Sequence, residues 1–326
     1  SVLFIFSFLI TSYSSGWMSL PTVISNIMTY FLFPFLLWKS IKSSKELNLA
    51  INIFYYVIAI AIFWGIIEII LRRNVIFEVV ESIFVLEDFT INADTIRYGV
   101  KRCNSFFSYF STYGVATFIA FIVFFTKGRW FPDKKHNYVA LSILCIIAAF
   151  STGSRAVYLG LFVALLLLLT DRKFIFGKYG VLLFCIVILF SPLFYSICVQ
   201  IIDSMLYSDK SMYASGSSAE LRFDQWGVCE YYFLKSPWVG NGRMYIWNEV
   251  SPNNPELLGA ESIWFSILVD YGILGALSFI CLIIACAVCL FRCNKRLICL
   301  PIGYLLILSL SPDQGIQYNI LITSTV

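Results

Sequence analysis

The chain has 326 residues, of which 60% are hydrophobic and 13% are charged, whereas soluble domains usually carry about 25% charged residues. This composition excludes an ordinary soluble enzyme. The net charge of +4 comes from 23 basic and 19 acidic residues spread along the chain, so no nucleic-acid partner is implied.

Apolar runs recur along the whole chain, and a helix that crosses a bilayer needs about 17 to 25 apolar residues. The predicted spans cover residues 1–12, 20–38, 50–71, 106–126, 137–152, 154–170, 179–200, 273–291 and 297–311. Because the chain begins inside an apolar stretch, further residues are expected before Ser1. The pattern predicts an all-α, polytopic membrane protein with about nine or more transmembrane helices, organised as one integral membrane domain over 1–326.

Short basic loops follow every second span. Their basic residues are Lys39, Lys42, Lys45, Lys127, Arg129, Lys134, Lys135, Arg172, Lys173, Lys178, Arg292, Lys295 and Arg296. The positive-inside rule places these loops in the cytoplasm. Segments 72–105, 151–155 and 201–272 and the tail after Ser311 are then predicted on the opposite side. Within the long outer loop 201–272, the aromatic-rich stretch from Leu221 to Leu234 predicts a short helix.

The turn Ser151-Thr152-Gly153-Ser154-Arg155 separates two spans that are both short. Such a turn can lie slightly below the outer membrane surface, where irregular backbone is tolerated only if protein buries it or it lines a polar cavity. Arg155 is therefore expected in a partly desolvated site, where a charge is a functional candidate. A snorkelling arginine at the interface is the alternative.

Three further arginines, Arg97, Arg222 and Arg243, lie in the predicted outer loops. Arginine stays charged and pairs bidentately with phosphate oxygens, so a set of arginines suits a lipid-linked phosphate or diphosphate. Taken singly, each is better explained as a solvated loop charge. The prediction depends on the set, and on a pattern that begins at Arg222 and continues with Trp226, Pro237, Gly240 and Gly242.

The only histidine, His136, falls in a predicted cytoplasmic loop, which leaves no Ser-His or Cys-His nucleophile on the outer face. The sequence also lacks metal-binding and phosphate-loop motifs, so neither a metal nor another cofactor is predicted. Any outer base is then a carboxylate. Glu261 is the best placed, followed by Asp224 and Asp270; for Glu261 the alternative is a helix N-terminal residue favoured by the helix dipole.

One carboxylate lies inside a predicted span. Glu68, in the span 50–71, is predicted to pair with Arg72 rather than to act in catalysis.

Together the motifs resemble those of the bacterial polysaccharide polymerase and O-antigen ligase superfamily. The similar stretches are residues 151–156, the pattern from Arg222 to Gly242, Glu261-Ser262 leading into residues 270–275, and Arg97-Tyr98-Gly99 ahead of Asn104. Ligases of this superfamily typically carry a histidine near the position of Glu261. This sequence has none there, which favours a polymerase.

The resemblance implies a metal-independent, GT-C-like glycosyltransferase of the bacterial inner membrane, in which 72–105 and 201–272 are periplasmic loops. It would join undecaprenyl-diphosphate-linked oligosaccharide repeat units at the periplasmic face. The implied catalytic residues are Arg155, Arg222 and Glu261, and the implied substrate-binding residues are Arg97, Arg243, Asp224, Trp226 and Asp270.

The expected partners are the lipid-linked oligosaccharide and membrane lipid, and the resemblance allows a chain-length regulator protein. An O-antigen ligase and a lipid-linked oligosaccharide flippase are the alternative functions. The nearly charge-free span centres and minimal cytoplasmic loops tell against the flippase.

Overall fold

The computed structural model describes residues 39–83, 96–97, 100–107, 109–130, 136–169, 219–242, 245–255 and 261–311, with four single positions at 28, 32, 36 and 199. Within these ranges the chain is mostly helical, in agreement with the predicted helical membrane protein. It forms two compact units, residues 40–201 with 302–307 and residues 1–39 with 202–301 and 308–326.

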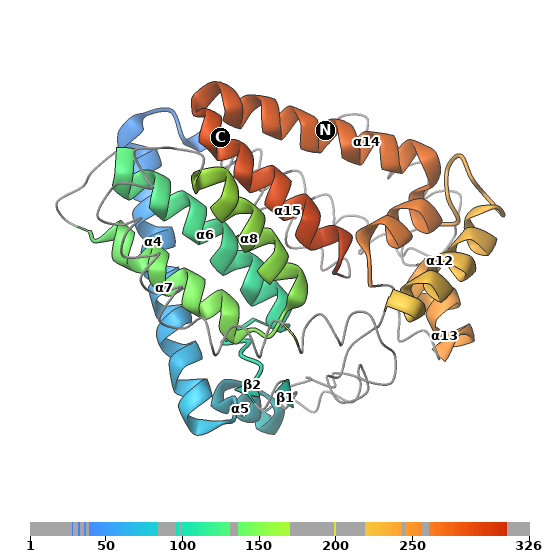
Figure 1. Cartoon of the computed structure of the whole chain (residues 1–326), viewed down its shortest axis with the longest axis horizontal. Helices are drawn as coiled ribbons and strands as arrows, with labels where there is room; N and C mark the ends of the chain where they lie inside the picture. The colour runs from blue at the N-terminus through green and yellow to red at the C-terminus, as the bar shows by residue number, and fades with distance from the viewer. Residues whose placement is uncertain are drawn as a thin grey trace. The chain divides into compact units, whose positions relative to one another are not determined.

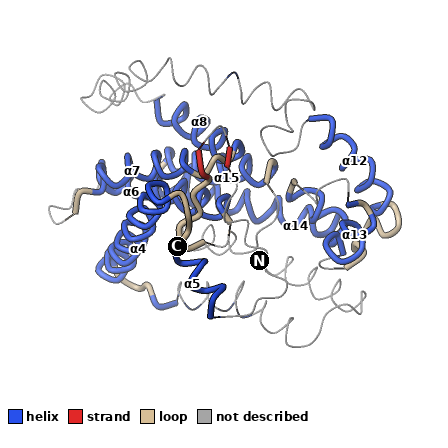
Figure 2. The backbone as a smooth tube through the Cα atoms, turned by 90° about the horizontal axis from the view of Figure 1, so that it is seen from below, coloured by secondary structure: helices blue, strands red, loops and turns tan. Residues whose placement is uncertain are grey.

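The first unit is a bundle of helices. It contains α4 (Ser44–Leu71), α5 (Val75–Ile83), β1 (Ile96–Arg97), β2 (Val100–Lys101), α6 (Phe110–Trp130), α7 (Tyr138–Ser151) and α8 (Arg155–Leu169). Helices α4, α6, α7 and α8 pack side by side (Figure 1). The strands form one short antiparallel ladder, which pairs Ile96 with Lys101 and Arg97 with Val100 (Figure 2).

Helix α6 is the centre of this bundle, because every residue from Ser111 to Ile122 is buried. Small residues allow its neighbours to approach closely, as is common between helices in membranes. A Cβ atom added at Gly114 would lie 2.7 Å from Val157 of α8. Residues 302–307 of α15 (Cys299–Ser309) complete the packing, since a Cβ at Gly160 of α8 would lie 2.5 Å from Ile307.

The helices of the bundle alternate in direction. Lys127, near the end of α6, bonds to Asn48 near the start of α4, and Tyr138 at the start of α7 bonds to Asn52. These three helix termini therefore share one end, where Ser43 and Glu46 also close the start of α4 with a capping box. The basic loops predicted after spans 20–38 and 106–126 accordingly border the same end of the bundle.

The second unit contains α12 (Ala219–Phe233), a π-helical turn η3 (Ile246–Val250), α13 (Ser251–Asn253), α14 (Ile263–Cys293) and the 3-10 turn η5 (Lys295–Ile298). Helix α12 and η3 pack against α14. Their shared core consists of Cys229, Ile246, Val250, Phe265 and Val269. The helix predicted over Leu221–Leu234 is confirmed as α12.

Among the described residues, three helices are long and apolar enough to cross a membrane, namely α4, Phe110–Gly128 of α6 and α14, and α7 and α8 are shorter apolar helices. Large apolar side chains are exposed on α4 at Ile53, Tyr56, Val57, Ile60, Phe63 and Ile70, and on α14 at Leu274, Leu277, Ile284, Val288 and Phe291. Spacings of three and four residues make each set one helix face. Apolar faces of this extent are expected to contact lipid.

Six of the predicted spans correspond to helices in the structure, namely 50–71 to α4, 106–126 to α6, 137–152 to α7, 154–170 to α8, 273–291 to the second part of α14 and 297–311 to α15. The predicted spans 1–12, 20–38 and 179–200 lie outside the described residues, apart from single positions. The full count of spans and the GT-C-like fold stay predictions.

Candidate functional site

The turn from Ser151 to Arg155 joins α7 to α8 and is closed by its own side chains. The hydroxyl of Thr152 donates to the carbonyl of Ala149 at 2.7 Å and accepts from the backbone N–H of Ser154 at 3.3 Å. Thr152 and Ser154 are buried, whereas Arg155, the first residue of α8, is partly buried. The turn is thus irregular backbone enclosed by protein between two short helices, and its depth below the outer membrane surface stays a prediction.

Residues 102 and 103, which precede α6, form hydrogen bonds to this turn. The N–H of Cys103 donates to the carbonyl of Ser151 at 3.0 Å, and Nε of Arg102 donates to the carbonyl of Thr152 at 3.1 Å. The guanidinium of Arg102 lies 3.1 Å over the ring of Phe110, a favourable cation–π position. Only 7% of Arg102 is exposed.

Arg102 is a residue that the sequence analysis missed. Lys101 and Arg102 form a basic pair directly before a span, on the side that the positive-inside rule leaves poor in basic residues. A pair of charges in that place needs partners within the protein, and this exception to the loop pattern was the available signal.

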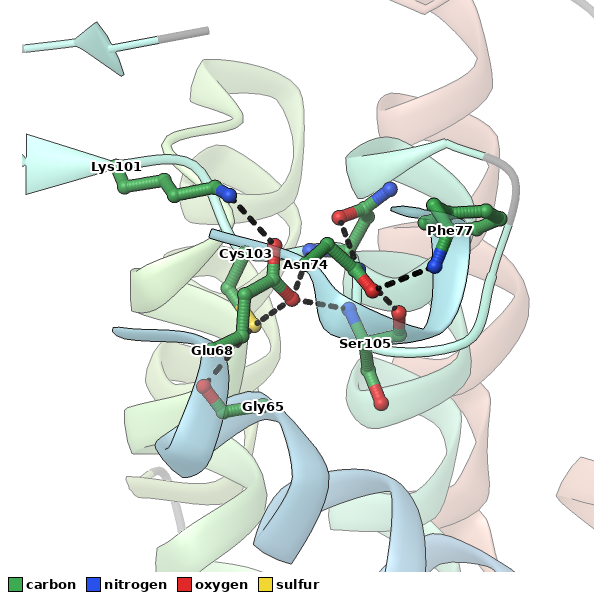
Figure 3. A network of polar contacts seen from close by, with 8 residues as sticks. Gly65, Glu68, Asn74, Phe77, Lys101, Cys103 and Ser105 are labelled. Carbon is green, nitrogen blue, oxygen red and sulfur yellow. Dashed lines mark hydrogen bonds and ion pairs between the residues drawn. The ribbon is translucent and has the colours of Figure 1, made fainter. Parts of the chain in front are cut away.

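Lys101 finds its partner in Glu68 of α4 (Figure 3), with Nζ 3.8 Å from the carboxylate. The predicted pairing of Glu68 with Arg72 is wrong. Helix α4 ends at Leu71, and Arg72 caps it in the left-handed conformation, with φ of 55°. The left-handed backbone at Arg72 turns its side chain away from the direction that an i, i+4 pair on a helix requires.

In the second unit, the structure brings Arg222 of α12 and Glu261 together. Their side chains form an ion pair at 3.5 Å and are 24% and 27% exposed. The same guanidinium nitrogen donates to the carbonyl of Leu310 at 3.3 Å. Two of the three predicted catalytic residues therefore share one partly exposed site.

An aromatic pair lies next to this ion pair, four residues after Arg222 and four residues after Glu261. Trp226 lies edge to face with Phe265, with ring centroids 4.7 Å apart. Because residues i and i+4 are neighbours on a helix surface, Trp226 follows Arg222 on the same side of α12. Trp226 is 46% exposed, and Asp224 is exposed on the same helix.

Helix α14 is broken at Gly272, which has φ of 64° and ψ of −163°. The loop after α12 satisfies the backbone groups that the break leaves without helical partners. The N–H groups of Asn241 and Gly242 donate to the carbonyls of Val269 and Asp270 at 2.9 and 3.0 Å. In return, the carbonyls of Pro237 and Trp238 accept from Ile273 and Leu274 at 2.8 and 3.1 Å. We call this four-bond contact between residues 237–242 and 269–274 the clip.

The clip explains why the pattern contains its glycines. A Cβ atom at Gly240 would lie 2.2 Å from the carbonyl oxygen of Asp270, and one at Gly272 would lie 2.7 Å from the carbonyl oxygen of Pro237. Both backbones approach too closely for any side chain. The Pro-x-x-Gly-x-Gly and Asp-Tyr-Gly motifs are therefore the two sides of one backbone contact.

Asp270 faces the protein backbone. Its carboxylate accepts from the N–H of Ile246 at 3.1 Å, and the residue is 4% exposed. This bond anchors η3 to α14; the predicted contact of Asp270 with substrate stays a prediction. Arg243 lies outside the described residues, and so does the side chain of Arg97, whose backbone is in β1.

His136 packs among Tyr55, Tyr56 and Tyr138, with centroid distances of 4.9, 5.4 and 5.6 Å. It directly precedes α7, whereas the Ser151 turn follows the other end of that helix. At 1.5 Å per residue, the helix separates the two by about 20 Å. Within the described part of the chain there is no cluster of three or more His, Cys, Asp and Glu side chains suited to a metal ion.

Comparison with known protein families links part of the chain to one family. Residues 140–280 match the family model described as O-antigen ligase. This match supports membership of the O-antigen polymerase and ligase superfamily. The matched residues include the Arg155 turn, Arg222, Glu261 and the clip, whereas Glu68 and residues 101–105 lie outside them. No curated protein and no solved structure matched the chain.

Proposed function

We propose that this protein is an O-antigen polymerase, which joins undecaprenyl-diphosphate-linked repeat units at the periplasmic face of the inner membrane. The observation that carries the proposal is the ion pair between Arg222 and Glu261, with the exposed indole of Trp226 one helical turn away. It offers a cation for a diphosphate, a carboxylate for a proton and an aromatic surface for a sugar.

The chemistry needs few groups, because a glycosyl diphosphate already carries a good leaving group. The acceptor hydroxyl attacks the anomeric carbon, the bond from that carbon to the diphosphate oxygen breaks, and the electron pair leaves on the lipid diphosphate. Arg222 and Arg155 neutralise the negative charge that develops there. The carboxylate of Glu261 takes the proton of the acceptor hydroxyl.

The ion pair couples substrate binding to the base. A diphosphate carries more negative charge than a carboxylate and binds a guanidinium through several oxygens. Its arrival at Arg222 would displace Glu261, which is then available to accept a proton. Arg97, Arg243, Asp224 and Asp270 are assigned to substrate binding in the same proposal. It requires no metal or cofactor, and a chain-length regulator is an optional partner.

The polymerase is favoured over the ligase by the place of the one histidine. Ligases resembling this chain typically carry a histidine near the position of Glu261, whereas His136 is enclosed by tyrosines at the end of α7 remote from the Arg155 turn. The ligase stays the second candidate because the matching family model bears that description.

Deleting and restoring the gene in the source strain tests the proposal, with lipopolysaccharide separated on a gel. We expect deletion to leave core carrying one repeat unit, and restoration to return the full ladder. If no repeat unit reaches the core after deletion, the chain is a ligase or a flippase and the polymerase proposal fails.

Restoration with single variants then tests the site. Arg222→Ala, Glu261→Gln and Arg155→Ala should each lower the yield of long chains at least about a hundredfold, because each removes a group that acts in the transition state. Arg73→Ala is a matched control, since Arg73 is 62% exposed and pairs only with exposed Glu78 among the contacts described. It should restore the full ladder at an equal protein level, and a full ladder from the three site variants would exclude the assigned roles.

A further inference from the structure

Glu68 is a buried carboxylate that the proposed chemistry does not use. Its side chain is fully buried in α4, and 5% of the Lys101 side chain is exposed. Figure 3 shows Lys101, Cys103 and Ser105 converging on this carboxylate. One oxygen of Glu68 accepts from the N–H groups of Ser105 and Asn104 at 2.8 and 3.2 Å, and from the thiol of Cys103 at 3.3 Å.

These contacts fix a segment that has no regular secondary structure of its own. Residues 102–104 lie between β2 and a turn, and buried N–H groups without partners are costly. Ser105 has φ of 54°, which is a strained conformation for a residue with a side chain. Asn74 also holds it, because its amide donates to the carbonyl of Ser105 at 2.6 Å and to Asn104 at 3.1 Å.

The thiol of Cys103 acts as a donor in this network. Burial, followed by the nearby Glu68 carboxylate, raises the pKa of Cys103 above its ordinary value. The thiol therefore keeps its proton, which points to Glu68 rather than making a second negative charge beside it.

The same segment also contacts the turn before α8. The backbone of Cys103 and the side chain of Arg102 donate to the carbonyls of Ser151 and Thr152, the residues four and three positions before Arg155. The α4 carboxylate and the α7–α8 turn thus both contact one short segment. No direct bond between them is needed for Glu68 to set the position of the turn.

We infer that Glu68 is a positioning residue for Arg155 and acts through residues 101–105. The inference depends on the proposed function for the role of Arg155. A buried ion pair can often be replaced by apolar residues without loss of stability, so holding the turn gives this pair a use beyond stability. A displacement of about 1 Å at a group in the site can reduce a rate by about a hundredfold.

A double-mutant cycle with Glu68→Gln and Arg155→Lys tests this role. Glu68→Gln preserves size and Arg155→Lys preserves charge. Activity is measured as kcat/KM of purified protein with lipid-linked repeat units in detergent. We expect each single variant to lose about tenfold and the double variant to lose no more than about twentyfold, because both impair one element. Losses that multiply to about a hundredfold would show that Glu68 does not act through Arg155. Glu78→Gln, an exposed acid of α5, is the matched control and should leave kcat/KM unchanged.

Amide hydrogen exchange provides a second test that needs no activity. In Glu68→Gln we expect faster exchange at residues 103–105 and also at 151–155, with α6 unchanged. Faster exchange at 103–105 alone would overturn the inference, whatever the activity of Arg155→Lys. Full activity of Arg155→Lys together with faster exchange in both segments would instead refute the function proposed for Arg155 and retain the positioning contact.

Discussion

At the scale of single residues, the two ion pairs differ chiefly in burial. Glu68 and Lys101 are almost completely buried at 3.8 Å, whereas Arg222 and Glu261 are about one quarter exposed at 3.5 Å. A pair that water reaches can be opened by a competing anion, because exposed ion pairs contribute little net stability. A buried pair resists opening, since each charge would be left in a medium of low dielectric constant without the partner described here. The first pair therefore suits a structural position, and the second suits a substrate site.

Lys101→Met is expected to destabilise the protein by about 3 to 5 kcal/mol, because it leaves the Glu68 carboxylate buried without a cation. The double variant Glu68→Gln with Lys101→Met removes both charges and should recover most of that loss. Thermal unfolding of the purified protein in detergent measures both changes. If the double variant is no more stable than Lys101→Met alone, the unpaired carboxylate is not the cause of the loss.

At this scale the sequence could identify candidate site residues by their type and position, but it could not show which of them contact each other in the folded chain. Arg222 and Glu261 were singled out separately, as a cation and a base, and their contact joins positions 39 residues apart. The pairing predicted within α4 failed because it assumed that the helix includes Arg72. The backbone turns left-handed there, and helix termini are the least certain feature of a sequence pattern.

At the scale of elements, the break in α14 shows how two weak motifs specify one contact. The sequence predicted a span from residue 273, since Asp270 and Gly272 interrupt the apolar run. The helix instead begins at Ile263, because Ser262 caps its start and accepts from the N–H of Trp264. The break at Gly272 persists because the clip supplies partners for the freed backbone groups. The glycines stood out as part of the pattern that begins at Arg222, but no local signal revealed that their partner was a helix about 30 residues later.

Gly272→Ala should release the clip, because alanine strains a backbone with φ of 64° and its Cβ atom would lie 2.7 Å from the Pro237 carbonyl oxygen. We expect a loss of several kcal/mol in stability.

The reactivity of Cys229 reports the change locally. Burial, followed by Asp270, raises the pKa of Cys229 to about 12, so at about pH 8 little reactive thiolate is present.

Maleimide labelling of Cys229, followed by mass spectrometry of its peptide, should therefore be slow in the wild type and at least about tenfold faster in Gly272→Ala. Gly227→Ala is the matched control on α12, because a Cβ atom there meets nothing within 4 Å. It should keep Cys229 protected and stabilise the helix by up to about 1 kcal/mol. Equal labelling in all three proteins would show that the clip does not hold α12 against α14.

At the scale of the whole molecule, the charge pattern and the helix directions are independent evidence on which end of the bundle lies on which side of the membrane. Contacts of Asn48 and Asn52 with Lys127 and Tyr138 place the start of α4, the end of α6 and the start of α7 at one end of the bundle. By the positive-inside rule, the basic loops predict that this end lies in the cytoplasm. The alternation was predictable because each helix reverses the chain, and short basic loops mark every second reversal. The clip and the Glu68 network were not, since both depend on long-range backbone contacts.

Labelling of single introduced cysteines tests this sidedness directly. Asn137→Cys, exposed at the start of α7, should react with a membrane-impermeant maleimide only after the cells are lysed. Asn253→Cys, exposed on α13, should react in intact cells whose outer membrane has been permeabilised. Peptide mass spectrometry distinguishes these sites from native thiols, and buried Cys103 and Cys229 provide protected internal references. Reaction of both sites from the same side would refute the predicted topology. It would also refute a periplasmic position for Arg222 and Glu261, because α13 and Glu261 are joined by only seven residues that contain no predicted span.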